Sequence, residues 1–304
     1  MLSDDVVIVT GGGNGLGEAA AKDLADYGAH VVVNDLGTSR TGDGESPEAA
    51  QSTVDEIEDA GGSAMAHFGD VADVEYTETL VQDAYEEFGR VDGVVNFAGI
   101  LGPRASIDEM SEDVWDRMTR VHLKGHYSLL HNVSSHWVER SEEDGLESQR
   151  SFVGVTSISI QGAETFPHYA AAKAGILGLV RTAAMELYEH NVRVNALSPS
   201  ADTSREDDDG SLDLFTHQSP HKVSPMVVFM MSDQFDDVTG CTMRAAGDLV
   251  GMISDPDFEK RGFRDGGWSV EDLEEHFLDH VLAGEDLTKT GVTYGPGAYF
   301  DDWG

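Results

Sequence analysis

The stretch VVIVTGGGNGLG, residues 6–17, passes from an apolar, β-branched run into a glycine-rich turn. The run is typical of a buried strand, and the residues after the turn have the pattern of a helix. Glycines at 11, 15 and 17 permit a tight turn and a close approach to a pyrophosphate, which the free N–H groups of the helix N-terminus would bind. The unit therefore predicts a dinucleotide site at Gly11, Asn14, Gly15, Leu16 and Gly17. No Gly-Lys-Ser/Thr follows, so the turn is not a P-loop.

Short apolar runs alternate with longer helical stretches along the rest of the chain. This alternation predicts an α/β fold, a doubly wound and mostly parallel Rossmann sheet with helices on both faces. The expected strands are residues 6–9, 30–34, 64–68, 93–97, 151–155, 193–197 and a last one at 240–246. The expected helices are residues 16–27, 47–60, 74–88, 111–138, 168–190, 222–231 and 270–282. The stretches 37–46, 139–150 and 200–213 are expected to be loops, the third either a surface loop or a mobile lid.

Acidic and small residues follow the second, third and fourth expected strands. Asp35 ends the second strand, 18 residues after Gly17, where a carboxylate would bind the ribose hydroxyls of adenosine. The same carboxylate would repel a 2′-phosphate, so we predict NAD as the cofactor, and Arg40 keeps NADP as the less favoured alternative. Further cofactor contacts are expected from Asp70, Val71, Asn96, Ala98 and Gly99.

Tyr169 and Lys173 lie four residues apart in an expected helix and therefore share one of its faces, and Ser157 follows the strand 151–155. A tyrosine pKa of about 10 means that acid–base work at neutral pH requires about 4 kcal/mol of preferential stabilisation of the phenolate. A Lys ammonium and an oxidised nicotinamide ring nearby would supply it. We therefore predict that Tyr169 exchanges a proton with an alcohol or ketone oxygen that Ser157 orients, while Tyr169 and Lys173 also contact the cofactor.

These motifs together resemble the short-chain dehydrogenase/reductase family over residues 4–250. The resemblance implies a seven-stranded sheet, a cofactor contact at Pro199, and a homodimer or homotetramer with the helices 111–138 and 168–190 at its interface. The matching positions are Thr10-Gly-x-x-x-Gly15-x-Gly17, Asn96-x-Ala98-Gly99, Ser157, Tyr169-x-x-x-Lys173, Asn195 and Pro199.

A narrower resemblance is to the dehydrogenase part of peroxisomal multifunctional enzyme type 2. It is carried by VVVNDLG at 31–37, AGIL at 98–101 and RVHLKG at 120–125. This resemblance implies oxidation of a (3R)-hydroxyacyl-CoA. It also implies a C-terminal extension over 247–304, packed on the Rossmann domain of residues 1–246 or on a partner subunit.

Two catalytic positions leave alternatives open. His122 stands where most family members have a proton-relay Asn, although the narrower subfamily also has His there. His122 is therefore either a catalytic relay residue or a side chain that packs the helix. Ser157 lies 12 residues before Tyr169, one fewer than is usual in the family, so Ser159 is an alternative catalytic serine.

The segment after Pro199 also departs from the family pattern. Ser200 replaces the usual Gly, and Thr203 and Ser204 have no settled register with the hydroxyls that hold a nicotinamide amide. The acidic stretch 200–213 would repel CoA phosphates, which argues against an acyl-CoA. Other 3-oxoacyl carriers, sugars, steroids and simple alcohols are the alternatives. A catalytically inactive NAD-sensing protein is a less favoured hypothesis, because both the Tyr and the Lys are present.

The composition is strongly acidic, with 57 Asp+Glu against 19 Lys+Arg and a net charge of −38. Such a surface repels itself in dilute buffer, whereas at 1 M salt the screening length falls to about 3 Å. The pattern is typical of halophilic proteins. Nucleic-acid binding is disfavoured because no basic patch exists, and no run is long enough to span a membrane. The single Cys241 forms no disulfide within the chain and has no metal-ligand company, so we expect no metal and a cytoplasmic location.

Overall fold

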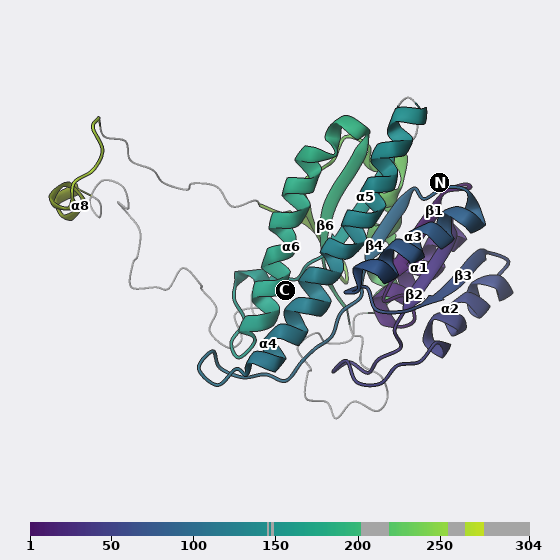
Figure 1. Ribbon diagram of the computed structural model, residues 1–304, viewed down its shortest axis with the longest axis horizontal. Coiled ribbons are helices and arrows are strands. Elements are labelled where there is room, and N and C mark those ends of the chain that lie inside the picture. Colours follow the sequence, from purple (N-terminus) through teal and green to yellow (C-terminus); the bar gives the residue numbers. More distant parts are fainter. Residues whose placement is uncertain (145, 147–148, 202–218, 255–264, 277–304) are drawn as a thin grey trace. The chain divides into compact units, whose positions relative to one another are not determined.

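The structure is a computed structural model that describes residues 1–144, 146, 149–201, 219–254 and 265–276. The chain divides into two compact units, Met1–Ile253 and Ser254–Gly304. The first unit contains an eight-stranded sheet with helices on both faces (Figure 1). The strands are β1 (Val6–Thr10), β2 (His30–Asp35), β3 (Ser63–Phe68), β4 (Gly93–Asn96), β5 (Arg150–Val155), β6 (Val192–Ser200), β7 (Thr242–Ala246) and β8 (Leu249–Ile253).

The strand order is β3-β2-β1-β4-β5-β6-β7-β8, and every neighbouring pair except the last is parallel. The predicted doubly wound Rossmann sheet is confirmed, but the expected number of seven strands is wrong. The eighth strand returns antiparallel to β7 through a two-residue turn at Gly247 and Asp248, where Gly247 has φ +57°. The strand order reverses beside β1, and ligands of such sheets bind at the carboxyl ends of the strands at that point.

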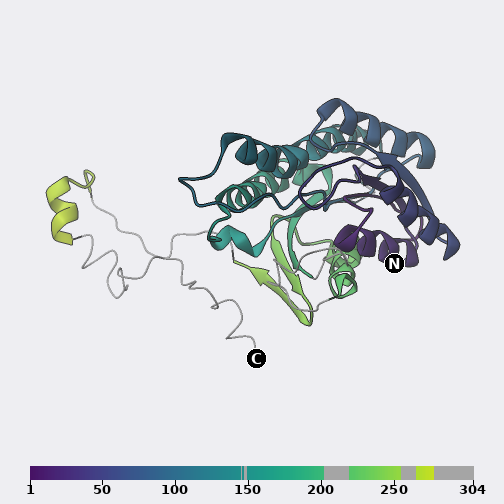
Figure 2. The same cartoon turned by 90° about the horizontal axis from the view of Figure 1, so that it is seen from below.

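Both faces of the sheet are covered, which explains the continuous apolar runs of the central strands. Along β1, Val7 and Val9 pack into the cluster with α1, α2 and α7, whereas Val6 and Ile8 pack into the cluster with α3, α5 and α6. The two helical layers are visible edge-on in Figure 2. The helices of this unit are α1 (Gly15–Asp26), α2 (Glu48–Asp59), α3 (Val74–Phe88), α4 (Glu112–Thr119), α5 (Gly125–Asp144), α6 (Pro167–Glu186) and α7 (Ser224–Met231).

The expected helix 111–138 is instead two α-helices joined by a π-helical turn, Arg120–Lys124. In this turn the N–H of Gly125 reaches back five residues to the carbonyl of Arg120. The expected loop 139–150 is partly wrong, because α5 continues to Asp144. Its glutamates are good helix formers, and the acidic composition alone did not mark the end of the helix.

The second unit contains the described helix α8 (Val270–His276), which begins with a capping box. The N–H of Ser269 donates to Asp272 Oδ2 at 3.1 Å, and the N–H of Asp272 donates to Ser269 Oγ at 3.1 Å. The rest of the expected helix, residues 277–282, lies outside the described residues. So do the proposed lid beyond residue 201, Thr203 and Ser204. Across the described ranges, no helix combines the length and apolarity that a membrane crossing requires.

Candidate active site

Gly11 and Gly17, in the turn between β1 and α1, leave no room for a side chain. A Cβ at Gly17 would overlap the carbonyl of Gly11, and a Cβ at Gly11 would lie 2.6 Å from the backbone nitrogen of Ala98. Gly11 and Gly15 have φ of +65° and +57°, which glycine adopts without strain. The side chain of the N-cap residue Asn14 makes no capping bond, so it does not cover the first N–H groups of α1. These features fit a bound pyrophosphate.

Asp35 lies at the end of β2, directly against this turn. Its Oδ2 accepts the N–H of Gly13 at 2.8 Å, and its Oδ1 accepts the N–H of Gly37 at 2.6 Å. The carboxylate is thus anchored by backbone donors on both oxygens, beside the turn that would hold the phosphates. This geometry suits a carboxylate that accepts bonds from ribose hydroxyls and repels a 2′-phosphate.

Asp70, an expected cofactor contact, already has a partner for each oxygen. Oδ1 accepts the N–H of Ala72 at 2.8 Å, and Oδ2 pairs with Arg120 Nη2 at 2.7 Å. Arg120 belongs to the π-helical turn, and sequence reasoning did not identify it as a site residue. Val71 beside Asp70 is buried, and its side chain would meet a Cβ at Gly125.

Asn96 and Pro199 occupy the ends of β4 and β6. Asn96 Oδ1 accepts the Thr10 hydroxyl at 2.7 Å and the N–H of Ala98 at 3.1 Å, so it links β1 to the turn after β4. Its buried Nδ2 has no partner among the described residues. Pro199 pairs with Ala245 of β7.

The side chains of Ser157 and Lys173 both approach the phenol of Tyr169. Burial raises the pKa of Tyr169 to about 12, and hydrogen bonding by the side chain of Ser157 opposes this rise. The alternative serine, Ser159, makes no such bond. Its N–H donates to Ser157 Oγ at 3.2 Å, and its own buried hydroxyl has no partner among the described residues. The effect on the pKa of Tyr169 therefore favours Ser157 over Ser159.

Lys173 is buried beneath the tyrosine ring, with Nζ 5.5 Å from the ring centroid. Nζ donates to the carbonyl of Val155 at 2.7 Å, and the backbone carbonyl of Lys173 accepts the Thr156 hydroxyl at 2.8 Å. Burial lowers the pKa of Lys173 to about 7. The end of β5 therefore fixes both the lysine and, through Ser157, the tyrosine.

His122 packs edge-on against Tyr169, with ring centroids 5.1 Å apart. Its Nε2 lies 2.8 Å from the carbonyl oxygen of Ile100 and 3.2 Å from the backbone nitrogen of the same residue, and its buried Nδ1 has no partner among the described residues. The ring fills the space beside Gly99, where a Cβ would collide with His122 Cε1. Burial and the charge of Lys173 lower the pKa of His122 well below its usual value, so the ring is neutral.

A second histidine, His126, was missed by sequence reasoning and lies directly below the site. Its Nε2 accepts the N–H of Val155 at 3.0 Å, so its Nδ1 carries the proton and donates to the carbonyl of His122 at 2.6 Å. Burial lowers the pKa of His126 to about 3. The ring therefore joins the π-helical turn to the strand end that holds Lys173. No motif marks this residue in the sequence, because both partners are backbone atoms.

Apolar side chains surround the outer part of the tyrosine ring. Ile100, Met118 and Phe166 form a small cluster against which Tyr169 packs, and Phe166 stacks on Tyr169 at 4.7 Å between centroids. The guanidinium of Arg104 lies 5.0 Å from the Phe166 ring. A phenol walled by apolar residues, on the same sheet as a glycine-rich turn that fits a pyrophosphate, suits the oxidation or reduction of an organic substrate.

The family described as short chain dehydrogenase matches residues 5–207 of this sequence. The chain belongs to the short-chain dehydrogenase/reductase family. Membership makes it an oxidoreductase of CH–OH groups that uses a nicotinamide cofactor.

Two relatives illustrate the range of the family. The hydroxyacyl-CoA dehydrogenase ChsB1 of Mycobacterium tuberculosis is 34% identical over 94% of this chain and 90% of its own length. Peroxisomal multifunctional enzyme type 2 of Mus musculus is 37% identical over 80% of this chain, which spans 32% of that longer protein.

Solved structures of dehydrogenases share the fold. A short chain dehydrogenase from Mycobacterium avium superposes with a TM-score of 0.80 at 35% identity, covering 92% of this chain and 95% of that one. Carveol dehydrogenase from the same organism, solved in complex with NAD, has a TM-score of 0.70 at 25% identity, covering 80% and 96%.

Proposed function

We propose that this dehydrogenase interconverts a secondary alcohol and a ketone with NAD as the cofactor and Tyr169 as the general acid/base. The observation that carries the proposal is that the side chains of Ser157 and Lys173 both approach the phenol of Tyr169. The Tyr169 phenol lies on α6, which follows β5, and the glycine-rich turn follows β1 of the same parallel sheet. Because ligands of such sheets bind at the carboxyl ends of the strands, the proton-exchanging group and the phosphate-binding backbone serve one ligand site.

Tyr169 moves the proton of the reaction. With its pKa raised to about 12 the phenol keeps its proton at neutral pH, which suits donation to a ketone oxygen during reduction. In oxidation the phenolate accepts the alcohol proton, and the hydroxyl of Ser157 favours that charged form. The cofactor, when bound, supplies the hydride chemistry. The Lys173 ammonium, held by Val155, stabilises the phenolate from below the ring.

Asp35 supports NAD in preference to NADP. Both of its oxygens are held by backbone N–H groups, so the carboxylate cannot easily turn away from a 2′-phosphate. Asp35→Ala is therefore expected to raise the use of NADP relative to NAD. An unchanged ratio of kcat/KM for the two cofactors would contradict this role.

A 3-hydroxyacyl-CoA is the leading substrate. It is supported by the similarity to a hydroxyacyl-CoA dehydrogenase over nearly the whole chain and by the apolar cluster beside Tyr169. The net charge of −38 opposes binding of the CoA phosphates in dilute buffer. A panel of hydroxyacyl thioesters, simple alcohols, sugars and steroids, assayed at high salt with both cofactors, distinguishes this substrate from the alternatives.

Tyr169→Phe tests the catalytic assignment. The variant should lose turnover while it still binds NADH, because the hydroxyl exchanges the proton but the ring and the glycine turn remain. Tyr27→Phe is a matched control, since Tyr27 lies half-exposed at the end of α1. Turnover that survives in Tyr169→Phe rejects the role of Tyr169. Detectable NAD-coupled oxidation of any alcohol by the wild type rejects an NAD-sensing protein without catalysis.

Exposed aromatic and apolar side chains on α5, at the end of α6 and in the turn just after it support a homodimer or homotetramer. Tyr127 on α5 is 46% exposed, and Met185 and Tyr188 are 82% and 72% exposed. A second copy that packs against these helices would bury them. Light scattering after size-exclusion chromatography at high salt measures the mass of the assembly, and a monomer there contradicts this interface.

A further inference from the structure

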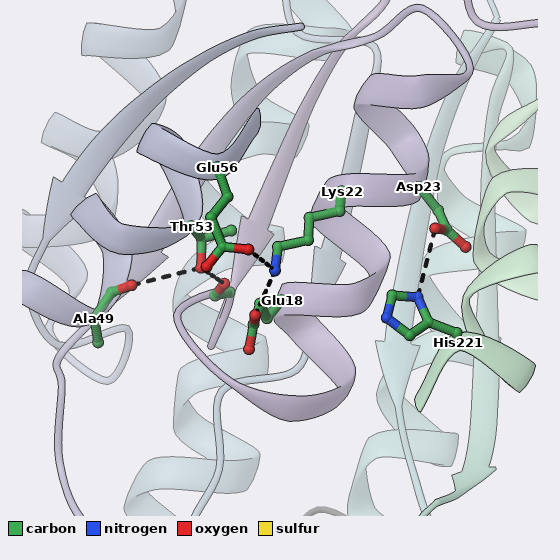
Figure 3. Close-up of polar contacts among 8 residues, drawn as sticks. Glu18, Lys22, Asp23, Ala49, Thr53, Glu56 and His221 are labelled. Carbon is green, nitrogen blue, oxygen red and sulfur yellow. Dashed lines mark hydrogen bonds and ion pairs between the residues drawn. The ribbon is translucent and has the colours of Figure 1, made fainter. Parts of the chain in front are cut away.

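Thr53 of α2 makes an unusual contact with the glycine-rich turn. The side chain is buried, and its Oγ1 lies 3.0 Å from the carbonyl oxygen of Gly12 and 3.5 Å from that of Ala49 (Figure 3). A threonine inside a helix commonly donates to the carbonyl four residues earlier, here Ala49. The hydroxyl has one proton to donate. Because the contact with Gly12 is the shorter one, the hydroxyl donates to the carbonyl of Gly12 in the turn and not to the carbonyl of Ala49 in its own helix.

The carbonyl that Thr53 holds belongs to the same peptide unit as the donor that holds Asp35. The Gly12 carbonyl and the Gly13 N–H are the two ends of one planar amide, so fixing the direction of one fixes the other. That N–H donates to Asp35 Oδ2 at 2.8 Å. Thr53 and Asp35 are therefore linked through a single rigid group.

Glycine at position 13 allows the close approach to Asp35, but it also leaves the Gly12–Gly13 peptide free to change its conformation. A Cβ there would lie 2.9 Å from Asp35 Oδ2 and 2.8 Å from the side chain of Ala49, so only glycine permits the approach. Peptides between two glycines also have the widest choice of backbone conformations. Without a partner for its carbonyl, the Gly12–Gly13 peptide could rotate and withdraw its N–H from Asp35.

An ion-pair cluster links α1 to α2. Lys22 of α1 binds Glu18 of its own helix at 2.6 Å and also binds Glu56 of α2 (Figure 3). Glu56 is one helical turn after Thr53. The cluster therefore joins α1 to α2 next to the Thr53 contact.

We propose that Thr53 is a positioning residue for cofactor selectivity, which through the Gly12–Gly13 peptide holds the Asp35 carboxylate in place to accept ribose hydroxyls and repel a 2′-phosphate. The proposal rests on the proposed use of NAD. Thr53 itself touches neither substrate nor cofactor in this role, and Asp35 remains the residue that contacts the nucleotide.

Thr53→Val and Thr53→Ser test the proposal, because valine keeps the shape without the hydroxyl and serine keeps the hydroxyl. We expect Thr53→Val to raise the Kd of NADH about three- to tenfold, the effect of losing one neutral hydrogen bond. The Kd of NADPH should change less, so the selectivity ratio narrows. Thr53→Ser should restore both the affinity and the ratio. If Thr53→Val does not fold, Thr53→Ala removes the same hydroxyl without branching at Cβ and is measured against Thr53→Ser.

Thr77→Val provides the matched control. Thr77 is a buried threonine of α3 whose hydroxyl accepts Asn132 Nδ2 at 2.8 Å, far in sequence from the turn. This variant should lose stability without changing the NADH/NADPH ratio, which separates positioning from general destabilisation. The same ratio in Thr53→Val as in the wild type overturns the role of Thr53. If the wild type binds NADPH better than NADH, the proposed NAD preference is wrong instead. Asp35→Ala tests that preference separately, because it should raise the use of NADP relative to NAD whatever the effect of Thr53.

Discussion

Asp5, just before β1, is a carboxylate whose ionisation destabilises the folded protein. Burial and the negative charge of Asp92 raise the pKa of Asp5 to about 6, and Arg90 opposes this only weakly. Arg90 binds Asp92 with two contacts of 2.7 Å, whereas its distance to Asp5 is 4.0 Å. Asp92 also accepts the N–H of Val6 at 2.8 Å, so it remains fixed beside Asp5.

The magnitude follows from the shift. From an ordinary pKa of 3.8 to about 6, ionised Asp5 destabilises the folded state by about 3 kcal/mol, an upper bound because the side chain is 30% exposed. A raised carboxyl pKa favours folding where the group is protonated, so this stability is present below pH 4 and is lost as the pH rises through 6. Asp5→Asn removes the charge, and the Asp5 side chain makes no hydrogen bond within the described residues that this change would break. The variant should therefore gain up to about 3 kcal/mol at pH 7 and about half of that at pH 5.

Urea unfolding at constant ionic strength, between pH 5 and pH 8, measures this gain. Asp116→Asn on the exposed face of α4 is the matched control, because it removes the same charge from a chain of −38 without changing a buried site. A gain in Asp5→Asn that equals the gain in the control, or that does not grow with pH, would refute the reasoning about burial.

Three further predictions concern salt, pH and the glycine turn. At salt concentrations below about 0.5 M, where the acidic surface is poorly screened, the activity, the fraction of oligomer and the melting temperature should all decrease. Equal values in dilute buffer would reject the halophilic interpretation. From acidic pH up to about pH 7, where Lys173 still carries its proton, kcat/KM for alcohol oxidation should rise about tenfold per pH unit while ketone reduction does not, since only oxidation needs the phenolate; parallel profiles would count against Tyr169. Gly17→Ala should lose NADH binding and about 1–3 kcal/mol of stability because its Cβ overlaps Gly11, whereas Gly178→Ala in α6, with open space around it, should not; thermal melts and NADH titration compare them.

Much of the fold was predictable because the strands are buried on both faces. The runs at 6–9, 30–34 and 151–155 lie within β1, β2 and β5, and a buried parallel strand needs no polar alternation. β8 was missed for the opposite reason. It is an edge strand with Val250 and Met252 exposed, and its five residues carry no buried run of their own.

The candidate site residues that follow motifs could be predicted from the sequence, and those that depend on tertiary contacts could not. Tyr169 and Lys173 are related by helical spacing, which the sequence displays directly. Arg120, His126 and Thr53 act on Asp70, Val155 and Gly12, each more than 25 residues away. Such partners are set by how α2 and the π-helical turn pack on the sheet, and no local pattern encodes that packing.

The contact between Gly99 and His122 constrains how this sequence can evolve. An alanine at position 99 would collide with the imidazole, so that substitution becomes acceptable only after position 122 has exchanged its ring for a smaller group. The reverse order passes through a disrupted intermediate. The two positions therefore form an epistatic pair, and ancestral reconstruction should find that any Gly99 replacement in this lineage came second.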